Sequence, residues 1–287
     1  MEVNVSPSVD LAAYFERIGY TGNVAPRAET LAALHLAHAT HIPFENLDVL
    51  LGQPILLDSK SLQQKLIRQR RGGYCFEQNS LLAIVLEQLG FCVTRLMARV
   101  CRGTNRQTPR THMLLMVDID GQRWLVDVGF GGWGPLQPLL LEPSHEARQF
   151  AWSYRVAADE EPGWYTLQAR MPTGWQDLYR FSLESYLPED FLIPNHFCAT
   201  HPDSRFMQTL TVQLPAPEVR YILRNRDFVT ATPDEEVARF IEEDRELRHL
   251  LRDQFGLVVA AESSLPTGSA VAAPANDWRS ILLANPS

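Results

Sequence analysis

The spacing of apolar residues changes once along this chain. Up to about residue 90, apolar side chains recur every three or four positions, as in amphipathic helices. From about residue 91 to 197 they alternate every second position, as in half-buried strands. We expect helices over residues 10–19, 27–40, 59–70 and 76–89, and strands over 93–100, 113–119, 124–130, 152–156 and 165–169. The order indicates an α+β fold in which a helical bundle precedes an antiparallel, partly closed sheet or barrel.

The last part of the sequence mixes both patterns. Two strand-like runs, 209–214 and 221–223, are followed by a predicted amphipathic helix near 232–235, where a threonine precedes a proline as at a helix start. A second short helix is expected over 245–255, before Gly256, and a flexible tail over 262–277. We therefore divide the chain into residues 1–90 (helical bundle), 91–200 (β-barrel) and 201–287 (an α/β lid with its tail).

Composition excludes several classes of protein. The 287 residues are 45% hydrophobic and 21% charged, which is ordinary for a globular protein, and the formal net charge is −8. Excess negative charge without a lysine or arginine run disfavours nucleic-acid binding. No apolar run could span a bilayer, and no export signal is evident, so the cytoplasm is the expected location. Four cysteines without a CxxC pair favour reduced thiols; Cys92 and Cys101 are expected to be structural.

One cysteine stands where a helix is expected to begin. Residues 71–79 read RGGYCFEQN, and two glycines place Cys75 at the mouth of the predicted helix. Backbone amides and the positive end of the helix dipole favour a thiolate there, and a thiolate beside a base is a nucleophile. A buried cysteine that packs as a small apolar residue is the alternative. The glycine pair and the polar run after Cys75 argue against that alternative.

A hairpin offers the base and an acid to orient it. Asp120 and Gly121 are typical of a two-residue turn. If Ile119 faces Gln122 across that turn, His112 and Asp127 lie on one face of the sheet as diagonal neighbours, within reach of each other. A turn-capping aspartate and an ordinary strand histidine are the alternatives for the two residues taken singly.

These pieces together resemble the arylamine N-acetyltransferase family. The family's RGGxCxE signature matches residues 71–77, its Thr-His strand start matches 111–115, and its DxGFG motif matches 127–131. Residues 43–47 (PFENL) match a further motif, and residues 195–197 with 200–206 resemble another. The resemblance covers about residues 43–206, in the expected order, and nothing after about residue 257 matches.

The resemblance implies a fold and a reaction. The fold would be a helical bundle, a β-barrel and an α/β lid around a core like that of cysteine proteases and transglutaminases. Cys75, His112 and Asp127 would form a catalytic triad that transfers acetyl from acetyl-CoA, a co-substrate, to arylamines, arylhydroxylamines or arylhydrazines by a ping-pong route. No permanently bound cofactor, metal, nucleic acid or membrane partner is expected, and no oligomeric state is predicted. A hydrolase with the same triad is the alternative function; a non-catalytic binding protein is disfavoured because all three triad residue types are present.

Further residues are candidates for substrate contacts. Phe44, Phe130 and Phe197 would line an apolar arylamine pocket, with ordinary core packing as the alternative. Gly131 and Gly132 lie in a glycine-rich run whose amides could approach a coenzyme A pyrophosphate, although such a run also suits a tight loop. The histidines at 35, 38 and 41 recur every third residue, but steps of three drift around a helix and no acid or cysteine joins them, so helix packing is favoured over a metal site.

Overall fold

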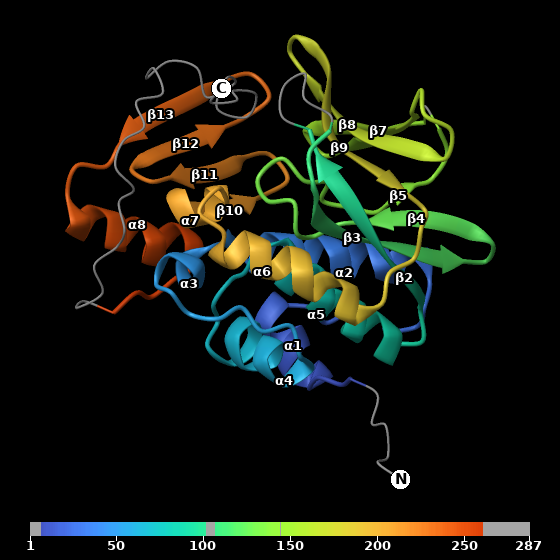
Figure 1. Ribbon diagram of the computed structural model, residues 1–287, viewed down its shortest axis with the longest axis horizontal. Helices are drawn as coiled ribbons and strands as arrows, with labels where there is room; N and C mark the ends of the chain where they lie inside the picture. The colour runs from blue at the N-terminus through green and yellow to red at the C-terminus, as the bar shows by residue number, and fades with distance from the viewer. Residues whose placement is uncertain (1–6, 102–106, 144, 261–287) are drawn as a thin grey trace.

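A computed structural model describes residues 7–101, 107–143 and 145–260 of the chain. The expected tail at 262–277 lies outside these residues. The described helices lie mainly at the start and near the end of the chain, and two antiparallel sheets lie between and beside them (Figure 1). The main helices are α1 Leu11–Ile18, α2 Ala28–His41, α5 Cys75–Gln88, α6 Leu192–Thr200 and α8 Asp244–Phe255. Shorter helices are α3 Leu47–Leu50, α4 Ser59–Leu62 and α7 Arg205–Gln208.

The predicted N-terminal helices are confirmed. The side chain of Asp10 accepts a hydrogen bond from the Ala13 amide at the start of α1, and Gly19 ends this helix in the left-handed conformation. The helix expected over 59–70 is irregular, because α4 continues into a π-helical segment, Gln63–Arg68. In Figure 1, α2 and α5 lie against the green strands, with α1 and α4 below them.

The larger sheet has eight strands in the order β5-β4-β3-β2-β9-β8-β7-β6. Its two ends approach each other, since β5 lies beside β7, and the sheet forms a nearly closed barrel. The strands are β2 Cys92–Val100, β3 Arg110–Ile119, β4 Gln122–Val126, β5 Leu139–Leu140, β6 Glu146–Gln149, β7 Trp152–Ala158, β8 Trp164–Met171 and β9 Gly174–Ser182.

The hairpin between β3 and β4 has the predicted register. Ile119 pairs with Gln122, and the two turn residues, Asp120 and Gly121, both have positive φ. The strand expected over 124–130 is too long, however, because β4 ends at Val126. Beyond that residue the chain turns away from the sheet, with Asp127 at the bend.

The smaller sheet combines distant parts of the sequence. Its order is β1-β10-β11-β12-β13, so that β1 Phe44–Glu45 from the helical part pairs with β10 Thr211–Pro215. The other strands are β11 Arg220–Arg224, β12 Asp227–Ala231 and β13 Glu236–Phe240. The orange and red sheet in Figure 1 packs against α8.

The helix expected near residues 232–235 is wrong. Those residues form the turn between β12 and β13: the Thr232 amide donates to the Glu235 carbonyl, and the Glu235 amide donates to the Thr232 hydroxyl. Threonine followed by proline suits a tight turn as well as a helix start, and pairing of Glu236 with Ala231 decides for the turn. The helix expected over 245–255 is confirmed as α8, which ends at Gly256 in the left-handed conformation.

Apolar residues form three cores. One lies between the N-terminal helices and one face of β3, one fills the barrel, and one lies between the smaller sheet and α8. Neighbouring residues of β3 therefore serve different cores: Met113 and Leu115 face the helices, and Leu114 faces the barrel interior. Within the described ranges, the helices are too short or too polar to cross a membrane.

Candidate active site

Cys75 is the first residue of α5, as the sequence predicts. The helix start is fixed by Glu77, whose carboxylate accepts a hydrogen bond from the amide of Tyr74 at 3.0 Å. The preceding glycines are needed for close approach. A Cβ atom on Gly72 would lie 2.1 Å from the carbonyl oxygen of Pro43, and one on Gly73 would lie 2.6 Å from the Glu77 carboxylate. The motif before the cysteine therefore sets where the helix begins.

His112 and Asp127 form the pair that the hairpin register predicts. The Nε2 atom of His112 lies 2.7 Å from Oδ2 of Asp127, and both side chains are buried. The other carboxylate oxygen of Asp127 accepts hydrogen bonds from the Asn79 side chain at 3.0 Å and from the Gly129 amide at 2.9 Å. The aspartate is thus fixed from three sides, which compensates for its burial.

The thiol of Cys75 is hydrogen-bonded to His112. Because Nε2 is engaged by Asp127, Nδ1 is the ring nitrogen left for the sulfur. Burial lowers the pKa of the His112 imidazole, but the charge and hydrogen bond of Asp127 outweigh burial and raise this pKa to about 10. Cys75, His112 and Asp127 are therefore one connected group.

The expected lowering of the thiol pKa is not observed. Burial raises the pKa of the Cys75 thiol, and the hydrogen bond and charge of His112 offset only part of this rise. Position at a helix N-terminus suggested the opposite direction. The sequence pattern shows the dipole and the histidine, but it does not show that the sulfur is only 3% exposed.

Cys75 and His112 line a pocket with a largely apolar wall. Phe44 and Phe130, both proposed from the sequence, line it, as do Trp133 and Phe206. The ring centroids of Phe130 and His112 are 5.3 Å apart, in an edge-to-face arrangement. Cys101 also lines this pocket, next to its predicted structural role, and Arg205 and Arg224 stand at the pocket wall as well.

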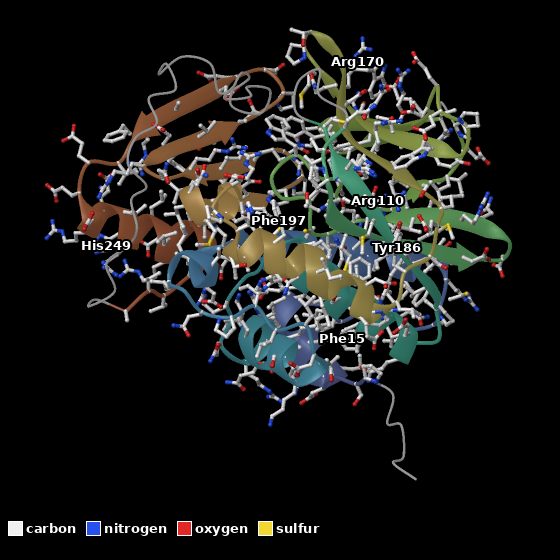
Figure 2. The ribbon with its side chains drawn as sticks, viewed as in Figure 1. Phe15, Arg110, Arg170, Tyr186, Phe197 and His249 are labelled. Carbon is white, nitrogen blue, oxygen red and sulfur yellow. The ribbon has the colours of Figure 1, made fainter. Side chains whose placement is uncertain are left out.

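Phe197 lies elsewhere. It lines a second hollow beside α6 together with Arg110, Tyr186 and Ile193, and its ring stacks on His201 with centroids 4.6 Å apart. Figure 2 labels Phe197 on α6, with Arg110 and Tyr186 nearer the barrel strands. Thr111 lines both hollows, so they are neighbours. The described structure does not bring Phe197 to the pocket of Cys75.

Gly131 and Gly132 also lie outside the residues that line the pocket. The Gly132 amide donates a hydrogen bond of 2.6 Å to the Gln213 side chain, and a Cβ on Gly131, where φ is +89°, would lie 2.3 Å from the same oxygen. The glycines thus let the loop after Asp127 pack closely against β10. Their expected approach to a cofactor stays a prediction.

The three helical histidines take separate places on α2. His38 is buried between the hydroxyl of Tyr14 and the side chain of Gln78, and His41 contacts the carbonyl of Ala37. His35 is completely buried, and burial lowers its pKa to about 4. Among the residues that the structure describes, no group of three or more histidine, cysteine or acidic side chains could hold a metal ion.

Two site residues were not found from the sequence. Asn79 connects α5 to Asp127 and also accepts a hydrogen bond from the Val128 amide. Tyr179 on β9 packs its ring against His112, with centroids 4.9 Å apart. Asn79 belongs to the polar run after Cys75, and a buried position could have been suspected from its helical spacing of four. Nothing in the sequence singles out Tyr179.

A cysteine at the start of a buried helix, facing a histidine–aspartate pair on a sheet, is the arrangement of papain-like and transglutaminase-like cysteine enzymes. Comparison with known proteins identifies the family within that class. A family model described as N-acetyltransferase matches residues 28–264. The chain belongs to the arylamine N-acetyltransferase family and is an acyltransferase.

Relatives match most of the chain. The arylamine N-acetyltransferase of Mycolicibacterium smegmatis is 41% identical over 226 residues, covering 77% of this chain and 82% of the relative. That of Escherichia coli is 37% identical over 249 residues, covering 86% and 88%. Among solved structures, the Mycobacterium marinum arylamine N-acetyltransferase in complex with CoA aligns with a TM-score of 0.81 at 36% identity, covering 86% of this chain and 92% of that one.

Proposed function

We propose that this enzyme moves an acetyl group from acetyl-CoA to arylamines, arylhydroxylamines or arylhydrazines through a thioester on Cys75. The observation that carries the proposal is the hydrogen-bonded group of Cys75, His112 and Asp127 on one pocket. Family membership and the CoA complex of a relative support the donor.

In the first half-reaction, the sulfur of Cys75 attacks the thioester carbonyl while its proton resides on His112. A bond forms between Sγ and the acetyl carbon, and the bond from that carbon to the coenzyme A sulfur breaks. The coenzyme A thiolate then takes the proton from His112 and leaves as a thiol. One thioester replaces another, so this exchange is close to thermoneutral.

In the second half-reaction, the amine nitrogen attacks the acetyl carbon of the acetyl-cysteine. The bond to Sγ breaks, and His112 takes the proton that the amine loses. The amide of Cys75 lies in the first turn of α5, where helix geometry leaves amides without an intrahelical acceptor. We infer that this amide stabilises the oxyanion of both steps.

The aromatic wall of the pocket suits an aryl acceptor. Phe44, Phe130 and Phe206 offer apolar surface beside the sulfur, which would bind a ring and keep water from the acetyl-cysteine. Phe197 remains a candidate at the neighbouring hollow, where a longer substrate could extend past Thr111.

Mass spectrometry after mixing with acetyl-CoA tests the thioester. The native protein should gain the mass of one acetyl group, and Cys75→Ala should gain none. Cys92→Ala is the matched control, because Cys92 is exposed at the start of β2 and outside the pocket. Acetyl labelling that survives Cys75→Ala would remove the proposed nucleophile.

Release of free coenzyme A separates transfer from hydrolysis. We expect sustained thiol release from acetyl-CoA only when an arylamine or hydrazine is present, with acetylated amine as the product. Equal release without amine would instead indicate a hydrolase that uses the same three residues. No release in either case would indicate a binding protein.

A further inference from the structure

The pocket has a cationic side opposite its apolar wall. Arg205 is the first residue of α7, and Arg224 is the last residue of β11; both are partly buried and line the same pocket as Cys75. The proposed transfer of an acetyl group to an amine does not by itself use two guanidinium groups.

Strand register locates these arginines relative to the aromatic wall. Phe44 pairs with Gln213, and Arg224 pairs with Thr211. Gln213 and Thr211 both line the pocket, so they share a face of β10, and a two-residue step along a strand is about 7 Å. Arg224 therefore stands about one ring-and-substituent length from the aromatic wall.

Arg205 approaches from the other side. The next residue in the chain, Phe206, packs against Phe44 with ring centroids 6.0 Å apart. The aromatic wall and the arginines are thus built from the same short segments, α7, β1 and the ends of β10 and β11. A substrate ring on the wall would point one of its edges toward the cations.

The two guanidinium groups repel each other. Burial, together with the nearby charge of Arg205, lowers the pKa of Arg224 to about 9. Among the described lining residues of this pocket, Asp177 is the single carboxylate, and its Oδ1 accepts a hydrogen bond from Gln168 at 2.7 Å. Two cations that face one cavity are stabilised by an anion between them, and arginine binds carboxylate and phosphate oxygens with paired hydrogen bonds.

We propose that Arg205 and Arg224 form a subsite for an anionic oxygen group of a substrate. The inference rests on the proposed function and names a property of its substrates. Two sources share this chemistry: the carboxylate of an acidic arylamine, and a phosphate of the acyl-CoA donor. The short span from the aromatic wall favours the carboxylate.

Ratios of kcat/KM test the acceptor. The donor is p-nitrophenyl acetate, which has no phosphate, and the acceptors are 4-aminobenzoate and its neutral analogue 4-aminobenzamide. Arg224→Gln should lower the ratio of acid to amide by about tenfold or more, since a charge-assisted hydrogen bond is lost. Arg224→Lys, which keeps the charge but not the paired donors, should restore part of the ratio.

A second pair of measurements tests the donor. With 4-aminobenzamide as the fixed acceptor, the ratio of acetyl-CoA to p-nitrophenyl acetate falls in Arg224→Gln if the subsite holds a phosphate. Arg245→Gln is the control for both ratios, because Arg245 is exposed on α8 and outside the pocket. If Arg224→Gln fails to fold, Arg205→Gln carries the same test.

A fall in either ratio supports the subsite and names its source. If neither ratio moves by more than twofold in folded variants of both arginines, the inference is overturned. Failure of the proposed function would look different, because the native enzyme would then yield no acetylated amine from either donor.

Discussion

At the scale of single residues, the site depends on how one buried carboxylate is held. Asp127 accepts hydrogen bonds from His112, Asn79 and the Gly129 amide, so both of its oxygens are occupied. Its charge keeps His112 protonated despite burial, and protonated His112 in turn favours the thiolate of Cys75. Asp127 thus acts on the sulfur through the histidine.

Asp127→Asn should move the reactivity of Cys75 to higher pH. Without the carboxylate charge, burial makes the His112 imidazole neutral near pH 7, and neutral His112 no longer lowers the pKa of the thiol. We expect acetyl transfer to fall by roughly 10³-fold or more. The rate of Cys75 alkylation by iodoacetamide, measured against pH, should shift its midpoint upward. Alkylation of the exposed Cys92 serves as the internal reference, and an unmoved Cys75 profile would contradict this coupling.

The sequence predicted this part of the site because the hairpin made distance countable. A two-residue turn fixes the register, and register places His112 and Asp127 on one face. Cys75 could be singled out by its glycines, although the raised pKa of its thiol could not be foreseen without knowing its burial. Tyr179 and Arg224 could not be found, because they reach the pocket through strand pairings that no local pattern encodes.

At the scale of elements, the start of α5 is held by a network of charges. Arg71 contacts the carboxylates of Glu45 and Asp48, each at 2.8 Å, and Lys65 contacts Asp48 and Glu77, each at 2.7 Å. The Glu45 side chain is fully buried. The network therefore joins α3, the π-helical segment and the residues before Cys75, and it fixes the helix end that carries the nucleophile.

Arg71→Gln should destabilise the protein. The change leaves the Glu45 carboxylate buried without its cationic partner, which costs about 3 kcal/mol of the free energy of unfolding. Urea unfolding followed by circular dichroism measures this cost. Arg68→Gln is the matched control, since the exposed pair of Arg68 with Asp10 contributes less than about 1 kcal/mol. Equal midpoints for the two variants would show that the network does not hold the helix start.

Elements with strong local signals were predicted well, and those that depend on pairing were not. α1 and α8 have clear periodicity, and each ends at a left-handed glycine. β13 was mistaken for a helix because the Thr232 turn resembles a helix cap, and only its partner strand identifies it. β9 lacks strict alternation but is buried between β2 and β8, where pairing on both sides decides its structure.

At the scale of the whole molecule, the pocket lies where the three cores meet. Cys75 comes from the helices, His112 from the barrel, and Arg224 from the smaller sheet. Two contacts connect these parts directly: β1 pairs with β10, and the buried Arg220 of β11 donates to the Tyr154 hydroxyl of β7 at 2.8 Å. The predicted three-part division of the chain stays a prediction, but the contacts show that neighbouring parts exchange segments. Such contacts between distant residues are what sequence periodicity cannot supply.

Gln213→Ala should weaken acceptor binding more than it slows the chemical steps. The Gln213 side chain accepts from the Gly132 amide and thereby ties β10 to the loop that carries Phe130 into the pocket. Removing it leaves a buried amide unpaired, at a cost of about 1–3 kcal/mol in the free energy of unfolding. With the loop loosened, KM for a neutral arylamine should rise roughly three- to tenfold, while kcat changes less, because the hydrogen bonds of Asp127 to His112 and Asn79 are kept. Steady-state kinetics and urea unfolding measure the two effects, and Gln208→Ala, an exposed change on the neighbouring α7, is the control. A fall in kcat with KM unchanged would mean that β10 supports the triad rather than the acceptor wall.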